Sequence, residues 1–252
     1  MSFEAGADAY DRFMGRFSAP LADELVRRLD LRPGLTALDV GCGTGAVTAR
    51  LAETLGPGQV AAADPSPTLL TALRARFPEV DAREAPAERL PFPDASFDRV
   101  VASLVVHFMK DPVAGLAEMR RVARPGGLVA ASVWDMVSGA GPLDLFWQGA
   151  RDLDPSVTAE TLLAGVAEGQ LAEVFAAAAM PRHESATLTV RLRFATFDEW
   201  WDPFTLGVGP AGAYVVELDP ERRARLRDRC AELAGPPPFE VSGSAWCVLA
   251  QV

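Results

Sequence analysis

The chain has 252 residues, of which 49% are hydrophobic and 23% are charged, a composition that suits a folded globular protein with a sizeable core. No apolar run reaches the roughly 18 residues needed to cross a bilayer, so we expect no membrane insertion. The net charge of −10 disfavours binding to a phosphate backbone, so we expect no nucleic-acid partner. The N-terminal residues lack the basic segment and apolar run of a secretory signal, and we expect a cytoplasmic protein.

Residues that bind metals are few and widely spaced. Cys42, Cys230 and Cys247 are an odd number at wide spacing, which fits neither a disulfide framework nor a zinc site of paired cysteines. The two histidines, His107 and His183, are also far apart. We therefore expect no metal centre.

Strands and helices alternate in the first half of the chain, after a helical stretch at residues 19–29. Each predicted strand is short and mostly apolar, and Ser66 is available as the N-cap of the second helix in this series. Because helices connect parallel strands through right-handed crossovers, the pattern predicts a doubly wound, mostly parallel α/β sheet. The predicted strands are 36–40, 59–63, 80–84, 97–103 and 128–134, and the predicted helices are 44–55, 67–77 and 112–122.

The alternation ends at residue 136. A half-exposed strand pattern follows at 183–194, and residues 239–249 could close the sheet. Four of the five tryptophans lie between Trp134 and Trp201, where the fold would place a helical cap over the carboxyl ends of the strands. Most of these aromatic residues are expected to form a small core of the cap itself. The predicted helices of this half are 142–153, 170–179, 197–204 and 220–233.

A glycine-rich loop joins the first strand to the next helix, in the sequence Leu-Asp-Val-Gly-Cys-Gly-Thr-Gly-Ala at residues 38–46. Glycines let a backbone turn tightly and approach a ligand closely, and free N–H groups at the helix N-terminus add polar contacts. Gly41, Gly43 and Ala46 also satisfy the dinucleotide-binding pattern. The loop by itself therefore leaves a dinucleotide cofactor open.

Two carboxylates separate the possible cofactors. Asp39 lies two residues before the first glycine on a strand expected to be buried, where an unpaired carboxylate is costly and would repel a pyrophosphate. A ligand with a positive ammonium and sulfonium suits this position, and S-adenosylmethionine is such a ligand. Asp64 ends the second strand, at the spacing of an acid that accepts from ribose hydroxyls. A role for Asp64 only in capping the following helix stays open.

Four segments, in order and spacing, resemble class I S-adenosylmethionine-dependent methyltransferases, and most closely the branch of ubiquinone and menaquinone C-methyltransferases. The resemblance covers residues 8–135 well and the rest loosely. It implies a Rossmann-like methyltransferase fold whose seven-stranded sheet has the order 3-2-1-4-5-7-6, with the last strand antiparallel. The four segments are 38–45, 64–66, 90–98 and 121–127.

The resemblance also implies roles for residues around S-adenosylmethionine. The ribose would contact Asp64, and the adenine would contact Pro65 and the N–H of Ala87. The family usually has an acidic residue just before the position of Ala87, whereas this chain has Pro86, so Glu84 or Glu88 would have to substitute. The residues expected at the cofactor are Tyr10, Arg16, Asp39, Gly41, Cys42, Gly43, Gly45, Asp64, Pro65, Ala87, Ser103 and Leu104.

Residues 10–17 resemble the flap that such enzymes fold over the cofactor, although an ordinary amphipathic lead-in stays open. Within this flap, Arg16 is a possible partner for the methionine carboxylate. Two other residues are candidates for a general base: His107, which follows the fourth strand, and Asp135, which ends the fifth. A structural role for His107 also stays open, and methyl transfer can proceed by positioning alone.

These observations predict a single methyltransferase domain. Residues 1–30 would form the flap and a helix, 31–135 the cofactor-binding core, 136–238 the cap elements with the sixth strand inserted, and 239–252 the last strand. We expect methyl transfer from S-adenosylmethionine to a small, apolar or aromatic acceptor. An RNA or protein methyltransferase and a cofactor-binding module without catalysis stay open, while Asp39 argues against a nicotinamide-dependent dehydrogenase.

Overall fold

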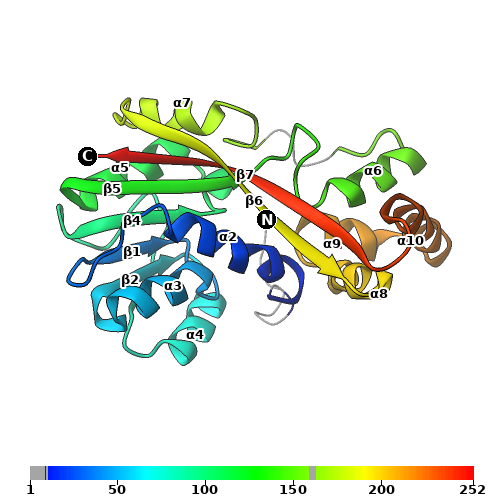
Figure 1. The fold of residues 1–252 in the computed structure, drawn as a ribbon, viewed down its shortest axis with the longest axis horizontal. Helices are drawn as coiled ribbons and strands as arrows, with labels where there is room; N and C mark the ends of the chain where they lie inside the picture. Colours follow the sequence, from blue (N-terminus) through cyan, green and yellow to red (C-terminus); the bar gives the residue numbers. More distant parts are fainter. Residues whose placement is uncertain (1–8, 10, 159–162) are drawn as a thin grey trace.

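The computed structural model describes residue 9 and residues 11–158 and 163–252, and its centre is a seven-stranded sheet (Figure 1). The strand order is β3-β2-β1-β4-β5-β7-β6, in which β7 pairs antiparallel with both of its neighbours and the other pairs are parallel. The fold class and strand order expected from the resemblance are therefore confirmed. The strands are β1 (Ala37–Val40), β2 (Val60–Asp64), β3 (Asp81–Glu84), β4 (Phe97–Ser103), β5 (Ala123–Trp134), β6 (His183–Phe194) and β7 (Phe239–Gln251).

Helices cover both faces of the sheet because its central strands are apolar on both sides. β1 and β2 are buried along their whole length, as strands in the middle of a parallel sheet must be. Alternate residues of each strand point to opposite faces, so Ala62 packs in one hydrophobic cluster and Ala61 in the other. One face carries α2 (Arg16–Val26), α3 (Ala46–Leu55) and α4 (Pro67–Arg76), and the other carries α5 (Pro112–Val122) and α7 (Gln170–Ala177).

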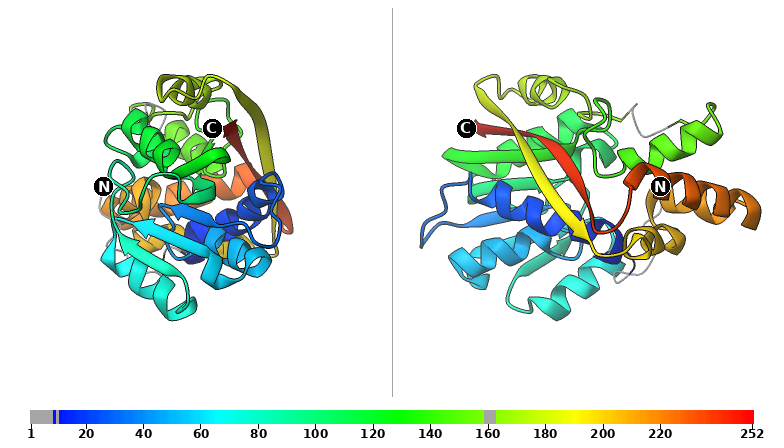
Figure 2. Two further views of the ribbon diagram at one scale, coloured as in Figure 1. Left: turned by 90° about the vertical axis from the view of Figure 1, so that its left-hand side faces the viewer. Right: turned by 45° about the vertical axis from the view of Figure 1, so that its right-hand side comes forward.

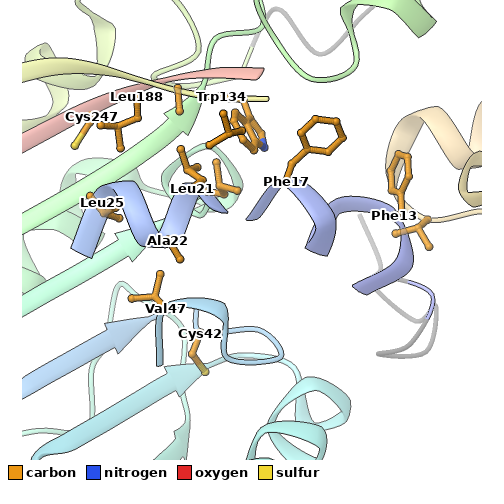
Figure 3. Packing of buried hydrophobic residues seen from close by; sticks show 14 of the residues in the cluster. Phe13, Phe17, Leu21, Ala22, Leu25, Cys42, Val47, Trp134, Leu188 and Cys247 are labelled. Carbon is orange, nitrogen blue, oxygen red and sulfur yellow. The ribbon is translucent and has the colours of Figure 1, made fainter. Parts of the chain in front are cut away.

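Helix α2 packs between the sheet and α3, the helix that follows the glycine-rich loop. Figure 3 shows Leu21 on the side of α2 that faces Trp134 and Leu188 of the sheet, and Ala22 on the side that faces Val47. A π-helical turn, η1 (Asp11–Gly15), precedes α2, so the helix begins at Arg16 and ends at Val26. The sequence predicted a later helix at residues 19–29, which would have placed Pro20 in its first turn, where a missing N–H costs little.

The remaining helices form a cap beyond the carboxyl ends of the parallel strands (Figures 1 and 2). The ends of β6 and β7 extend toward it. The cap consists of α6 (Asp144–Leu153), α8 (Phe197–Trp201), the 3-10 helix η4 (Asp202–Leu206), α9 (Gly209–Glu217) and α10 (Pro220–Ala234). Helix α7 lies within the predicted cap region, but it packs on the sheet because Leu171 and Phe175 are buried in the same cluster as α5.

An aromatic core holds the cap together. The rings of Phe146 and Phe204 stack with centroids 4.6 Å apart, and Trp200 lies 4.8 Å from Phe204. These three residues, together with Trp201, are buried, as expected for most of the aromatic residues in this half. Helix α9 was not predicted, because its first residues are Gly-Pro-Ala-Gly; burial of Ala211 and Val215 provides the packing for the helix. Within the described ranges, no helix combines the length and the hydropathy that crossing a membrane requires.

Candidate functional site

The glycine loop (residues 41–45) leaves β1 at the carboxyl edge of the sheet. The N–H of Gly41 donates to the carbonyl of Ala63 at 2.7 Å, which continues the pairing of β1 with β2 by one residue. Gly41 has a φ of +68°, and a Cβ there would overlap the side chain of Val105. Only glycine fits both the backbone and the space at this position. Gly43 also has a positive φ, of +54°, but it faces open space, so its backbone can be approached by a ligand.

Asp39 is a buried carboxylate directly below this loop. Its side-chain oxygen accepts a 2.6 Å hydrogen bond from the Thr48 hydroxyl of α3, and only 2% of the residue is exposed. Burial raises the pKa of Asp39 to about 7; the hydrogen bonds from Thr48 oppose this shift, and the nearby charge of Asp64 adds to it. Among the described residues no cationic side chain forms an ion pair with Asp39. The site can therefore accept a positively charged ligand group or a proton.

Asp64 links the end of β2 to the glycine loop and to α4. One carboxylate oxygen accepts from the N–H of Gly43 at 2.9 Å, and the other accepts from the N–H of Ser66 at 2.8 Å. Burial raises the pKa of Asp64, and these two hydrogen bonds lower it in part. The N-cap of α4 is the hydroxyl of Ser66, as predicted, which accepts from the N–H of Leu69. Asp64 therefore stabilises the loop, and each oxygen keeps a lone pair for another donor.

A cavity opens at the glycine loop, and six of the residues predicted at the cofactor line it. Five of the described predicted residues lie outside its lining: Asp64, which is described above, Arg16, which is described below, and Gly45, Pro65 and Ala87. Gly45 precedes α3 at its N-cap, Pro65 is exposed beyond Asp64, and Ala87 is buried beside α5. The six residues brought together are Asp39, Gly41, Cys42, Gly43, Ser103 and Leu104.

The proposed substitutes for the missing acidic residue before Ala87 differ in their surroundings. The carboxylate of Glu88 accepts from the N–H groups of Lys110 and Asp111, so it already holds the segment before α5. Glu84 ends β3 directly beside Asp64 in the sheet register, and it is exposed. Of the two, Glu84 is the better placed to contact a ligand at the edge formed by β2 and β3.

The flap contains one prediction that the structure does not support. Arg16 forms an ion pair with Glu199 of α8 at 2.5 Å and lies 4.7 Å over the ring of Phe194, so its charge is already neutralised on the cap side of the molecule. Arg16 is also absent from the lining of the cavity at the glycine loop. A different flap residue reaches that loop: Asp11 accepts a 2.6 Å hydrogen bond from the Thr44 hydroxyl. Tyr10 lies outside the described residues.

A second cavity, which we call the chamber, lies between the flap, the sheet and the cap. Leu104 lines both cavities, so they adjoin at this residue. Leu104 has a φ of +61° and donates its N–H to the carbonyl of Ser132, which turns the chain at the end of β4. The chamber is lined mainly by apolar side chains, among them Phe13, Met14, Trp134, Met136, Leu143 and Trp147.

His107 lines the chamber from the 3-10 helix η3 (Val106–Phe108). It is 6% exposed, and its Nδ1 is enclosed without a hydrogen-bond partner in the part of the chain that the structure describes. Burial lowers the pKa of His107 to about 4, so the imidazole is neutral at physiological pH. The side chain thus has the location that the base hypothesis requires, but burial makes it a weak base.

Asp135 has no access to the chamber lining. One of its oxygens accepts from the N–H groups of Val137 and Ser138 at 3.1 and 3.0 Å, and the other accepts from the Ser138 hydroxyl. Asp135 therefore closes the turn after β5, and the structure does not support its role as a base. The carboxylate that does line the chamber is Asp144, the first residue of α6. The sequence does not single out Asp144, because an acidic residue in the first turn of a helix is common and does not by itself indicate a ligand site.

Comparison with known proteins agrees with this geometry. Residues 38–131 match a family described as a methyltransferase domain. The chain is 34% identical over 135 residues to a demethylmenaquinone methyltransferase of Lysinibacillus sphaericus, covering 50% of this chain and 58% of that protein. It is 36% identical over 124 residues to a ubiquinone/menaquinone biosynthesis C-methyltransferase of Burkholderia cenocepacia, covering 46% and 51%. The chain thus spans about half the length of the curated relatives it matches.

The fold as a whole is also found in solved structures. A putative methyltransferase from Bacillus halodurans superposes with a TM-score of 0.59 at 17% sequence identity, covering 91% of this chain and 97% of that one. At this identity the likeness concerns the fold alone. The sequence match ends near the end of β5, so the chamber and the cap are not assigned by it.

Proposed function

We propose that the protein transfers a methyl group from S-adenosylmethionine to a small, mostly apolar or aromatic acceptor, because residues 38–131 match a methyltransferase domain and the sheet has the strand order that the resemblance to class I methyltransferases implies. The observation that carries this proposal is the buried carboxylate of Asp39 at the cavity of the glycine loop. A carboxylate without a cation at this position fits the ammonium group of S-adenosylmethionine and opposes the pyrophosphate of a dinucleotide.

The residues around the glycine loop fit this cofactor. Gly43 presents backbone to open space beside Asp39, and Ser103 and Leu104 form the opposite wall of the cavity. Asp64 retains acceptor capacity for the ribose hydroxyls, and Glu84 lies beside it in the register of the sheet. When bound, the cofactor supplies a methyl group on a positively charged sulfur.

The chamber would hold the acceptor. Its shared wall at Leu104 places the acceptor next to the cofactor cavity, and its aromatic lining excludes water from the ligand. Holding two groups in line provides a large part of the rate of such a displacement, on the order of 7–11 kcal/mol in favourable cases. The two curated relatives are named for reactions on demethylmenaquinone and in ubiquinone and menaquinone biosynthesis. Quinone-like rings are therefore among the acceptors to be tested.

Calorimetry tests the cofactor first. We expect S-adenosylhomocysteine to bind and to raise the melting temperature, because a ligand that binds only the native state stabilises it, whereas NAD should do neither. Binding of NAD in place of S-adenosylhomocysteine at millimolar ligand would overturn the assignment. Transfer of label from methyl-labelled S-adenosylmethionine to phenols, amines and quinols then tests turnover. Label on RNA or protein alone would indicate a macromolecular acceptor, and binding without any transfer would indicate a module that lacks catalysis.

A further inference from the structure

The chamber has few polar groups, and the ring nitrogens His107 Nδ1 and Trp134 Nε1 have no hydrogen-bond partner among the described residues, while one oxygen of Asp144 is also without a donor there. Among its described lining residues, the side chains with nitrogen or oxygen atoms are His107, Trp134, Asp144 and Trp147, and there is no lysine or arginine. A mostly apolar cavity uses such isolated polar groups to orient its ligand. Their chemistry therefore limits what the ligand must offer.

Trp134 supplies a hydrogen-bond donor. It ends β5 and is 2% exposed, and its indole Nε1 is buried without a hydrogen-bond partner anywhere in residues 11–158 and 163–252. Figure 3 shows its ring at the end of the strand, with the nitrogen on the side of Phe17. The indole N–H can only donate. Leaving a buried donor unsatisfied is unfavourable, so a ligand oxygen that displaced the packing of Phe17 against this ring and reached the nitrogen would gain a hydrogen bond that the described residues do not make.

Asp144 supplies an acceptor. One of its oxygens accepts a hydrogen bond from the N–H of Gly141. The other oxygen accepts none from the residues that the structure describes. Burial raises the pKa of Asp144; the Gly141 bond lowers it in part, Asp135 raises it, and Arg151 lowers it. Because no cationic side chain is among the described residues that line the chamber, the second oxygen of the partly buried Asp144 can accept from a donor on the ligand.

We propose that Trp134 and Asp144 determine the specificity of the chamber, which takes an uncharged aromatic compound bearing two polar groups. A hydroxyl of the ligand donates to Asp144, a carbonyl oxygen of the ligand accepts from the indole N–H of Trp134, and the ring lies among the apolar side chains. This inference rests on the proposed function, because the ligand concerned is the methyl acceptor. A protonated amine would satisfy Asp144, but it has no lone pair to accept from Trp134.

Binding of matched probe compounds tests this inference separately from turnover. Calorimetry at pH 7, with and without S-adenosylhomocysteine, would compare 3- and 4-hydroxyacetophenone with 4-methoxyacetophenone, 4-ethylphenol and benzylamine. We expect the better hydroxyacetophenone isomer to bind roughly ten- to a hundred-fold more tightly than the methoxy compound, which cannot donate. It should bind about three- to ten-fold more tightly than 4-ethylphenol, which lacks the carbonyl oxygen.

Two variants assign these preferences to residues. Asp144→Asn can still accept from Gly141, but it presents an amide donor to the chamber, so the preference for hydroxyl over methoxy should vanish or reverse. Trp134→Phe keeps the ring and removes the N–H, so the preference for the carbonyl compound over 4-ethylphenol should disappear. Trp201→Phe, in the aromatic core of the cap and outside the chamber lining, is the control and should keep both preferences.

The possible failures are distinguishable. Absence of S-adenosylhomocysteine binding would overturn the proposed function, whereas the probe preferences are measured without that ligand as well. Equal binding of the hydroxy and methoxy compounds, or tighter binding of benzylamine than of either hydroxyacetophenone, would overturn the inference even if the cofactor binds. If Asp144→Asn fails to fold, the comparisons on the wild-type protein and on Trp134→Phe still decide the result.

Discussion

At the scale of single residues, Asp39 is the acidic group in the lining of the glycine-loop cavity, where we propose that the cofactor binds. Because its pKa is raised to about 7, only about a tenth of the protein carries the carboxylate at pH 6. For a ligand that binds only the charged form of Asp39, the apparent affinity at pH 6 is reduced to about a tenth of its value for the fully charged protein. We therefore expect the affinity for S-adenosylhomocysteine, measured by calorimetry, to rise about ten-fold between pH 6 and pH 8.

The same pKa shift makes the stability of the folded protein change with pH in the opposite direction to its ligand affinity. A carboxyl group whose pKa is higher in the folded state than in the unfolded state stabilises the protein below pH 3.8, and this contribution is lost as the pH rises through 7. Asp39→Asn keeps an acceptor for the Thr48 hydroxyl and cannot ionise, so its ligand affinity should be weak and independent of pH in this range. Equal affinity of the wild-type protein at pH 6 and pH 8 would contradict the role of Asp39.

Asp64 allows a second test of the cofactor site. Asp64→Ala removes the acceptor for the N–H of Gly43 and the proposed acceptor for the ribose hydroxyls, and we expect the dissociation constant of S-adenosylhomocysteine to increase roughly ten- to a hundred-fold. The circular dichroism spectrum should stay that of the wild type. Ser66→Ala, which removes the N-cap of α4 and keeps Asp64, should bind the ligand normally. Similar binding by Asp64→Ala and the wild type would show that this carboxylate only holds the loop and the helix.

Substitution of His107 distinguishes catalysis by a general base from catalysis by positioning alone. A positioned general base contributes roughly 10²- to 10⁴-fold to the rate, but burial lowers the pKa of His107 to about 4 and makes it a weak proton acceptor. We therefore expect His107→Ala to reduce turnover by less than about ten-fold, and Trp134→Ala to reduce it more, because it loosens the acceptor. A loss of about 10² or more with unchanged cofactor affinity in His107→Ala would establish the base.

At the scale of elements, the flap and the first turn of α2 connect the two cavities to the cap. Phe13 lines the chamber and packs edge-on against Phe204 at 5.0 Å, while Asp11 bonds to Thr44 of the glycine loop. The ion pair of Arg16 with Glu199 joins the same segment to α8, with the two side chains 31% and 38% exposed. Such a half-exposed pair contributes little to stability, about 1 kcal/mol or less.

Substitution of Arg16 tests where its charge acts. Because Arg16 already has a partner in the cap, Arg16→Ala should leave the affinity for S-adenosylhomocysteine within about two-fold of wild type. Its melting temperature should fall only slightly, and Glu199→Ala should lower it by a similar amount. A ten-fold loss of ligand affinity in Arg16→Ala alone would instead support the contact with the methionine carboxylate that the sequence suggested.

At the scale of the whole molecule, charge bears on the choice of acceptor. The chain has 34 acidic and 24 basic residues, and the arginine-rich helix α10 pairs its charges with neighbouring acids. Arg227 pairs with Asp198 at 2.5 Å and Arg229 with Asp152 at 2.7 Å, so acidic partners neutralise these two arginines. In a gel-shift assay at low salt we expect no binding of transfer RNA at about 10 μM protein. A shift that weakens steeply with added salt would contradict this and favour an RNA acceptor.

The α/β core and the location of the glycine-loop cavity could be predicted from the sequence alone. Short apolar strands alternating with helices, and glycines directly after Val40, are local signals, and local sequence decides where a strand ends and whether the backbone can turn left-handed. The same locality explains why Asp39, Gly41, Cys42 and Gly43 were predicted together, since all four lie on one strand and its loop.

Only the tertiary structure decided the partners of charged and buried groups. Arg16 meets Glu199 across 183 residues of chain, and no local pattern indicates that contact. Asp135 and Asp144 lie close in sequence, yet the turn after β5 encloses the first and the start of α6 directs the second to the chamber. Likewise, the low pKa of His107 follows from the burial of its side chain at the wall of the chamber. Burial and long-range pairing depend on how separate elements pack, which periodicity along the chain does not specify.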